Sequence, residues 1–167
     1  MVTQVGTALD VASAVTDPEM PMLTLADLGV LRDVAEDPQR PGRVVVTITP
    51  TYSGCPAMAS MRDDLVRRLQ GSGFPDVEVV VSLSPAWSSD WISERGRAAL
   101  VAHGLSAPGV AATGPVVLNL GTTRRAVDCP RCGADDVALL SEFGPTACTT
   151  LYRCSSCLET FQHVKEI

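Results

Sequence analysis

The sequence predicts an α+β protein, in which a small helix-on-sheet domain is followed by a separate C-terminal module rich in cysteine. Three observations support this fold class. Segments of helical and strand periodicity alternate over the first hundred residues. Apolar residues make up 46% of the 167 positions and charged residues 19%, which is enough for a hydrophobic core. Five of the six cysteines lie between Cys129 and Cys157, whereas Cys55 stands alone.

The first half of the chain predicts a helix followed by a β-hairpin. Val5–Val15 places apolar side chains on one helical face, and Pro18 ends the helix because proline disfavours the helical conformation of the preceding residue. Val30–Val34 and Arg43–Thr49 have the composition of strands, and the segment between them is dense in turn-forming residues. The two strands should therefore pair.

The next part predicts a helix, a strand and a further helix. Pro56–Leu69 is the clearest helix, because its apolar residues follow one stripe. Val77–Leu83 is expected to be the third strand, and Asp90–His103 a helix that stops at Gly104. The expected domain ranges are 1–104 for the helix-on-sheet domain, 105–125 for a linker or wrapping segment, and 126–167 for the cysteine module.

Charge and hydropathy exclude several classes of partner. The formal net charge is −6, whereas nucleic acids and anionic membranes select clustered Lys and Arg. No apolar run approaches the roughly 20 residues of a membrane helix, and no secretory leader is visible. We therefore expect a cytoplasmic protein with reduced cysteines, whose partner is another protein or a small ligand. The sequence leaves open whether it is a homo-oligomer.

The strongest chemical signal is a pair of C-x2-C motifs, formed by Cys129, Cys132, Cys154 and Cys157. Two such turns can direct four thiolates to the corners of a tetrahedron, which predicts a zinc-ribbon-like module with a structural zinc ion. The same ligands also hold iron or an iron–sulfur cluster, so the sequence leaves the metal open. Ala138–Leu140 and Thr149–Tyr152 are the expected ribbon strands.

Two further side chains of this module lie outside the tetrad. Cys148 is expected to be a small buried hydrophobe, and the alternative is a spare metal ligand. His163 is expected to be a surface residue of the last strand, with an alternative role as a ligand.

Cys55 lies where a strand ends and a helix begins. With Pro56 in the first helical turn, Cys55 would be at or near the N-cap, where the helix dipole favours a thiolate. It is then a nucleophile or a transient metal ligand, or alternatively a small packing residue beside Ser53 as the true cap. Catalysis needs a nearby base, and neither His103 nor His163 is placed near it by sequence. We therefore expect no catalytic residue.

Three segments of the first domain carry a family resemblance. Residues 17–29 (DPEMPMLTLADLG), 51–58 (TYSGCPAM) and 87–94 (WSSDWISE) resemble the signatures of the SufT-type iron–sulfur maturation domain. The tail segments 141–148 (SEFGPTAC) and 151–157 (LYRCSSC) are similar to the PaaD subgroup, which belongs to phenylacetate degradation.

The resemblance implies an accessory protein that matures or inserts the iron–sulfur or metal centre of the multicomponent phenylacetyl-CoA epoxidase. It implies the epoxidase subunits, including the iron–sulfur reductase, as partners, and a non-catalytic scaffold subunit is the alternative. Cys55 matches the reactive cysteine of the family and implies transient binding of iron or a cluster. The positions implied to support it are Asp17, Glu19, Thr51 and Ser53. The tail tetrad matches the metal site of the subgroup.

Overall fold

The computed structural model describes residues 2–52, 54–109 and 127–167. Its residue contacts divide the chain into an N-terminal unit, Met1–Trp87 with Trp91–Gly96, and a C-terminal unit, Ser88–Asp90 with Arg97–Ile167. This division differs from the predicted ranges 1–104, 105–125 and 126–167, which stay a prediction about domains. Residues 105 and 106, which fall in the predicted linker, pair with the tail.

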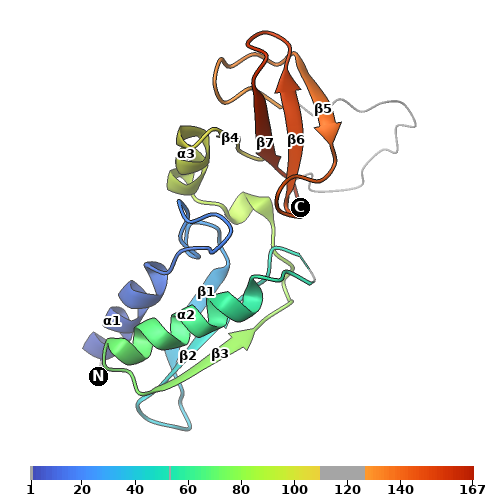
Figure 1. Cartoon of the computed structure of the whole chain (residues 1–167). Coiled ribbons are helices and arrows are strands. Elements are labelled where there is room, and N and C mark those ends of the chain that lie inside the picture. The colour runs from blue at the N-terminus through green and yellow to red at the C-terminus, as the bar shows by residue number, and fades with distance from the viewer. Residues whose placement is uncertain (1, 53, 110–126) are drawn as a thin grey trace. The chain divides into compact units, whose positions relative to one another are not determined.

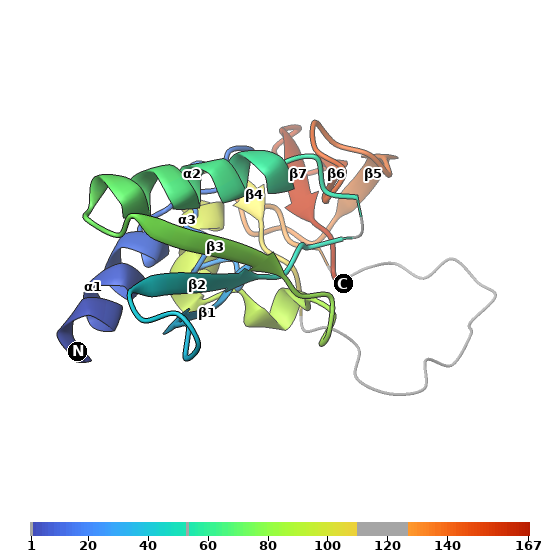
Figure 2. The same cartoon turned by 90° about the horizontal axis from the view of Figure 1, so that it is seen from below.

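The N-terminal unit is a three-stranded sheet with two packed helices, as Figures 1 and 2 show. Its elements are α1 (Val2–Ser13), β1 (Leu31–Glu36), β2 (Arg43–Ile48), α2 (Met58–Gly71) and β3 (Asp76–Val81). The strand order is β1-β2-β3, with β1 antiparallel and β3 parallel to the central strand β2. The predicted hairpin, the third strand and the α+β class are thus confirmed.

The core of this unit lies between the sheet and the helices. Every second residue of β2 is buried, namely Val44, Val46 and Ile48. Helix α2 buries Met61, Leu65 and Leu69, which lie on one helical face at spacings of four residues. Because α1 contacts β1 and β2 while α2 contacts β3, and the two helices touch each other, the helices cover one face of the sheet.

Three predicted helices have other bounds in the structure. Helix α1 covers Val2–Ser13 instead of Val5–Val15. Helix α2 begins at Met58 with Ala57 as its N-cap, instead of at Pro56, because residues 56 and 57 form a turn. The predicted helix Asp90–His103 is a short 3-10 helix, η1 (Ser89–Trp91), followed by α3 (Glu94–Ala102). The interruption has a local cause, since the Ser93 hydroxyl accepts the Gly96 N–H and starts a new helix.

The C-terminal unit contains a four-stranded sheet with the order β4-β7-β6-β5. Its strands are β4 (Leu105–Ser106), β5 (Val137–Ser141), β6 (Thr149–Cys154) and β7 (Thr160–Val164). Strands β5, β6 and β7 are antiparallel, whereas β4 runs parallel to β7. The two predicted ribbon strands lie within β5 and β6. Part of the predicted linker is therefore a strand, and its residues 110–125 lie outside the described residues.

One cluster of buried residues in the C-terminal unit includes two cysteines of the tetrad. It consists of Val127, Cys129, Tyr152, Cys154 and Phe161. The Tyr152 and Phe161 rings stack with centroids 6.0 Å apart. No helix in the described parts of the chain has the length and apolar character needed to cross a membrane.

Candidate functional sites: a lone cysteine and a four-thiol centre

Cys55 lies on the loop between β2 and α2, and its side chain is half-buried. Its N–H donates to the Tyr52 carbonyl at 3.3 Å, and its own carbonyl accepts the Met58 N–H at 3.3 Å. Because α2 has its N-cap at Ala57, Cys55 is two residues before the cap. Cys55 is therefore near the N-cap but is not the cap itself, and the helix dipole acts on its thiol from further away than it would at the cap.

Of the residues expected to support Cys55, Asp17 has hydrogen-bond partners in its own turn. Asp17 is buried, and its Oδ1 accepts the N–H groups of Glu19 at 2.7 Å and Met20 at 2.8 Å. Burial raises the pKa of the Asp17 carboxyl, against the lowering effect of these two hydrogen bonds. Glu19 is exposed and Thr51 half-buried, whereas Ser53 lies outside the described residues. Their support of Cys55 stays a prediction.

Asp27 is a buried carboxylate that joins two segments of the N-terminal unit, the turn at residues 24–27 and residues 93–95. Its Oδ1 accepts hydrogen bonds from the Ser93 hydroxyl at 2.8 Å and from Arg95 Nε at 3.0 Å. Its Oδ2 accepts the Thr24 hydroxyl at 2.8 Å. Burial alone raises the pKa of Asp27, but the hydrogen bonds from Ser93 and Thr24 and the charge of Arg95 hold it below its ordinary value. This carboxylate is an anchor of the fold.

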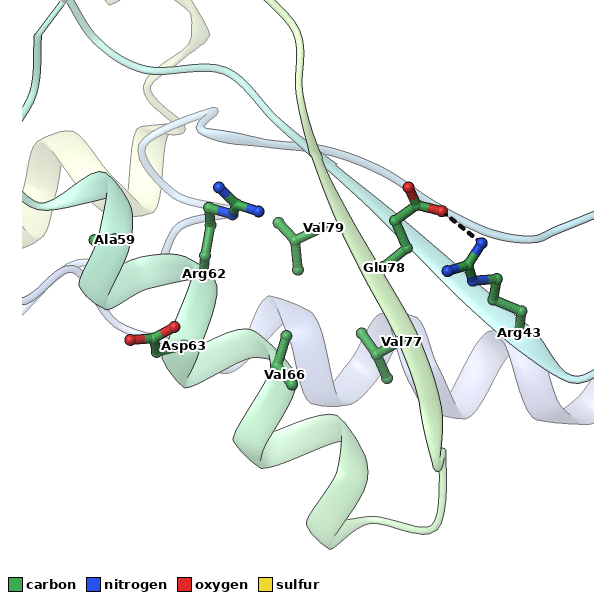
Figure 3. Close-up of a pocket in the computed structure, with 8 residues that line it drawn as sticks. All are labelled: Arg43, Ala59, Arg62, Asp63, Val66, Val77, Glu78 and Val79. Carbon is green, nitrogen blue, oxygen red and sulfur yellow. Dashed lines mark ion pairs between the residues drawn. The ribbon is translucent and has the colours of Figure 1, made fainter.

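A cavity of about 490 Å³ opens between α2 and β3 (Figure 3). It is lined by Arg43, Ala59, Arg62, Asp63, Val66, Val77, Glu78 and Val79. Arg43 forms an ion pair with Glu78 at 2.9 Å, so part of the charge of the cavity is neutralised. The lining contains neither cysteine nor histidine, and therefore offers no thiol or imidazole as a nucleophile or metal ligand.

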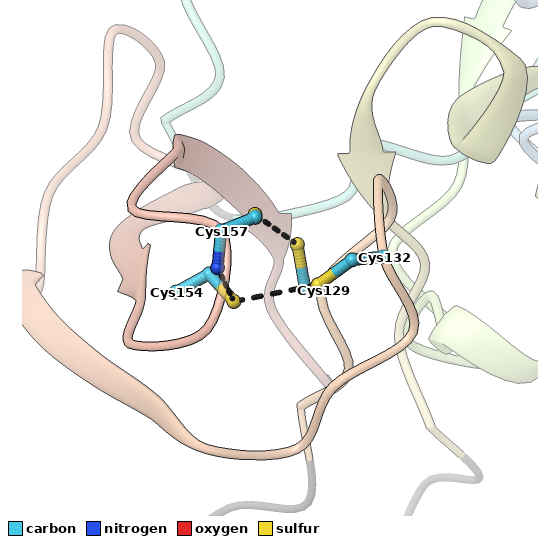
Figure 4. Close-up of side chains that lie close together, drawn as sticks. All are labelled: Cys129, Cys132, Cys154 and Cys157. Atoms are coloured by element: carbon cyan, nitrogen blue, oxygen red, sulfur yellow. Dashed lines mark hydrogen bonds between the residues drawn. The ribbon is translucent and has the colours of Figure 1, made fainter.

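The four tail cysteines converge in the C-terminal unit (Figure 4). All four Sγ atoms lie within 4.8 Å of one another. The Sγ atoms of Cys129 and Cys157 are 3.7 Å apart, and those of Cys132 and Cys154 are 3.6 Å apart. In the described parts of the chain, this is the one group of three or more His, Cys, Asp or Glu side chains with metal-binding spacing.

Both C-x2-C motifs fold into the same turn. In the first, the Cys129 N–H donates to the Ala134 carbonyl, and the Gly133 N–H donates to the Cys129 carbonyl. In the second motif, the Cys154 N–H donates to the Glu159 carbonyl, and the Leu158 N–H donates to the Cys154 carbonyl. The sequence separations are the same as in the first motif. The residue after each second cysteine has a positive φ, 72° for Gly133 and 63° for Leu158. The repeated turn directs the thiols inward.

The two halves of the tetrad differ in exposure. Cys129 and Cys154 are buried in the core, whereas Cys132 and Cys157 are exposed. The Cys157 N–H, together with that of Ser156, points at the Cys154 sulfur and lowers the pKa of Cys154 to about 7. The pKa of Cys132 is lowered by the Ala134 N–H, but the crowding of the other thiols raises it to about 12.

The spacing of the four thiols fits one tetrahedral metal ion. Zinc–sulfur bonds of about 2.3 Å in a tetrahedron place neighbouring sulfurs about 3.8 Å apart, close to the two distances found. A cluster of several iron atoms would hold the cysteines further apart, because they bind different irons. The chemistry of the donor set and its geometry therefore favour a mononuclear ion.

Cys148 and His163 lie outside the tetrad. Cys148 is buried, as expected, and its Sγ lies 3.2 Å from the Thr146 hydroxyl. The predicted surface position of His163 is wrong, because this side chain is fully buried. Its Nδ1 lies 3.1 Å from the Ser106 hydroxyl and its Nε2 3.0 Å from Glu166 Oε1. No local sequence pattern indicated this network, since Ser106 falls in the predicted linker.

Comparisons with known proteins support both units. Residues 3–88 match the family described as "Iron-sulfur cluster assembly protein", and residues 113–165 match "PaaD zinc beta ribbon domain". The chain is 40% identical over 158 residues to a protein of Escherichia coli (strain K12) whose name describes it as a putative subunit of 1,2-phenylacetyl-CoA epoxidase. That alignment covers 92% of this chain and 87% of the relative.

A solved structure resembles the N-terminal half. The crystal structure of "Domain of Unknown Function DUF59 from Bacillus anthracis" superposes with a TM-score of 0.51 at 27% identity. The match covers 59% of this chain and 92% of that chain. The predicted family and the predicted zinc ribbon are thereby confirmed. This chain belongs to the iron–sulfur cluster assembly protein family and carries a PaaD zinc beta ribbon domain at its C-terminal end.

Proposed function

We propose that this protein matures a metal centre of the phenylacetyl-CoA epoxidase, to which it delivers iron or an iron–sulfur cluster bound transiently by Cys55. A zinc ion in the tail tetrad holds the C-terminal unit in its fold. The name of the 40% identical relative supports this client, and the family of residues 3–88 supports this cargo.

The separation of two kinds of thiol within one chain carries this proposal. Four cysteines converge on a single point in the C-terminal unit, whereas Cys55 lies in the N-terminal unit and is half-buried. Four protein ligands fill a tetrahedral ion and leave no position for an incoming ligand, so a metal ion there is resident. One cysteine leaves most positions of a metal open to the ligands of a donor or an acceptor protein.

Exchange between thiolates is the chemistry that such a carrier uses. The incoming client thiolate binds the metal, the bond to the Cys55 sulfur breaks, and Cys55 regains a proton, with no change in oxidation state. The acidic net charge of −6 does not oppose the binding of an iron ion, because that cargo is a cation.

The test compares the wild type with Cys55→Ala after purification without oxygen. We expect one zinc per chain in both, and iron with or without sulfide in the wild type alone. We also expect the epoxidase matured with Cys55→Ala to lose most of its activity. Cys148→Ala is the matched control, because it removes a thiol outside the tetrad and should keep both properties.

A non-catalytic scaffold subunit of the same epoxidase is the second candidate. It is favoured by one observation: in the part of the chain that the structure describes, Cys55 belongs to no group of three metal-binding side chains. If the protein is a scaffold, the Cys55→Ala variant should still assemble with the epoxidase, and the epoxidase should keep its full activity. The same activity measurement therefore separates the two functions.

A further inference from the structure

Strand β3 is an unpaired edge of the N-terminal sheet. In the described parts of the chain it pairs with β2 alone, in a parallel register that is unbroken along the whole strand. The Ser82 N–H, just after β3, donates to the Ile48 carbonyl of β2 at 2.9 Å. Because successive N–H groups of a strand point to opposite sides, those of Val77, Val79 and Val81 point away from β2. Strand β3 therefore presents a row of backbone donors and acceptors to a further strand.

The side chains along this edge do not prevent a further strand from pairing. Val80 is 39% exposed, and Leu83, two residues beyond the strand, is 67% exposed. The two carboxylates of β3 are paired from within the sheet, because Arg43 on β2 lies 3.2 Å from Asp76 and 2.9 Å from Glu78 (Figure 3 shows the second pair). The edge thus lacks the unpaired charges with which proteins commonly block strand addition.

The other edge strands of the two described sheets are protected. Strand β1 has a register shift between Leu31 and Asp33, with the charged side chains of Arg32 and Asp33 exposed. Strand β5 has a register shift between Leu139 and Ser141, and β4 is two residues long. Such shifts twist an edge away from an incoming strand. Within the described sheets, the straight edge that matches β3 is therefore the β3 of a second copy.

We propose that two copies of this chain dimerise by antiparallel pairing of β3 with β3, with Val80 opposite Val80 at the two-fold axis. Identical strands that join edge to edge about a two-fold axis run antiparallel. The two three-stranded sheets then become one continuous sheet, and the free edge of each copy is removed. Because the far edge β1 is protected, addition of strands stops at two copies.

The register follows from the side chains that it brings together. Val79 lies opposite Val81 of the second copy, so that apolar side chains meet on both sides of the axis. Glu78 lies opposite Ser82, and no carboxylate faces another carboxylate. A register centred on Glu78 would instead place two carboxylates opposite each other, which is unfavourable. The register centred on Val80 also brings the exposed Leu83 into the contact.

The mass of the zinc-loaded full chain in solution tests this dimer, and sedimentation equilibrium gives its Kd. We expect the wild type and Cys55→Ala to be dimers, since Cys55 lies outside β3. Val80→Lys should raise the Kd at least about tenfold, because it places two ammonium groups opposite each other at the axis. Val101→Lys is the matched control: it replaces a valine of similar exposure (47%) in α3 and should dimerise like the wild type.

Disulfide trapping tests the register. It uses zinc-loaded Cys55→Ala protein, in which the tetrad thiols bind metal and the half-buried thiol is absent. With oxidised glutathione, Val80→Cys should form a disulfide between copies, because residues that face each other without mutual hydrogen bonds have Cα atoms about 4.5 Å apart. Leu83→Cys is the control. Its side chain lies opposite Val77 of the second copy, so the two introduced thiols would be about 20 Å apart along the strands.

Three outcomes would overturn the inference. A wild type that sediments as a monomer would do so, even if it bound a purified epoxidase subunit through Val80, because the occupant of the edge would then be another protein. A Val80→Lys dimer as tight as that of the wild type is the second, and equal trapping of Val80→Cys and Leu83→Cys is the third. Tryptophan fluorescence reports on the folding of the N-terminal unit in each variant. If Val80→Lys fails to fold, the two cysteine variants decide the question.

Discussion

Cys55 and Cys154 show two ways in which a backbone turn presents a thiol. Cys154 is fully buried, receives backbone N–H groups on its sulfur, and has three other sulfurs within 4.8 Å. Cys55 is half-buried on a loop before α2. A thiol that converges with others can hold its unit together through a metal ion, whereas a thiol standing apart from such a group contributes little to folding. The first should therefore be essential for structure and the second for function.

Of the substitutions that test this difference between Cys154 and Cys55, removal of a tetrad thiol should have the largest effect on folding. Cys154→Ala leaves three ligands and should abolish stoichiometric zinc binding. Because structural zinc supplies about 10 kcal/mol or more of folding free energy in small zinc modules, we expect the slow amide hydrogen exchange of β6 to be lost as well. Cys55→Ala should keep both zinc and slow exchange, and fast exchange in that variant would refute the distinction between the two thiols.

Gly29→Ala should have the next largest effect, and it acts on the N-terminal unit. Gly29 has a φ of 69°, and an added Cβ would be 2.5 Å from the Trp91 Cβ atom. The strain of the left-handed conformation, about 1–2 kcal/mol, would add to an overpacking cost of about 1–3 kcal/mol. Gly73→Ala is the control for strain alone, because its φ is 96° and nothing lies within 4 Å of its added Cβ.

Urea unfolding followed by tryptophan fluorescence measures this difference. Both tryptophans of the sequence, Trp87 and Trp91, belong to the N-terminal unit, so the signal reports on that unit. Equal losses in Gly29→Ala and Gly73→Ala would mean that the close approach of Trp91 contributes nothing.

The acid dependence of the N-terminal unit should follow Asp27. Because its native pKa lies below the ordinary value of 3.8, the carboxylate contributes its full stability above that pH and loses it as the pH falls through the native pKa. Asp27→Asn should be less stable at neutral pH and should flatten the fluorescence-detected stability curve below pH 4. A curve as steep as that of the wild type would show that Asp27 is not the group responsible.

Asp17 provides a control, because its contribution to stability changes with pH in the opposite direction to that of Asp27. Its pKa is raised, so its contribution is fully present below pH 3.8 and is lost as the pH rises through the native value. Asp17→Asn keeps an oxygen acceptor for the two N–H groups and should therefore reduce the loss of stability above pH 4.

The smallest effect is expected for the ion pair between the two cysteine turns. Arg131 Nη1 lies 2.9 Å from Glu159 Oε1, and both side chains are largely exposed. Exposed pairs of this kind contribute less than about 1 kcal/mol. Arg131→Ala should keep its zinc and its thermal midpoint within a few degrees, and a loss of zinc would show that the ion pair, and not only the thiols, holds the turns together.

The sequence predicted what local patterns determine. The order of helices and strands and the convergence of the four cysteines follow from periodicity and motif spacing. The first residue of α2 was missed because Pro56 is compatible with both a turn and a first helical turn. The burial of His163 and the strand at Leu105–Ser106 were missed for another reason: they depend on contacts between residues 57 positions apart, which no local pattern reveals.

The pairing of β4 with β7 has a consequence for the order of events during translation. Leu105 leaves the ribosome before the four tetrad cysteines, whereas its partner Gln162 leaves after them. Cys132 also precedes Cys154 by 22 residues, a delay of about 1–4 s at ordinary rates of synthesis. During that interval the nascent chain exposes a two-thiol chelate without its second half. The edge strand can close the sheet only when the ribbon is complete, so metal capture and strand pairing are both late events in the life of the nascent chain.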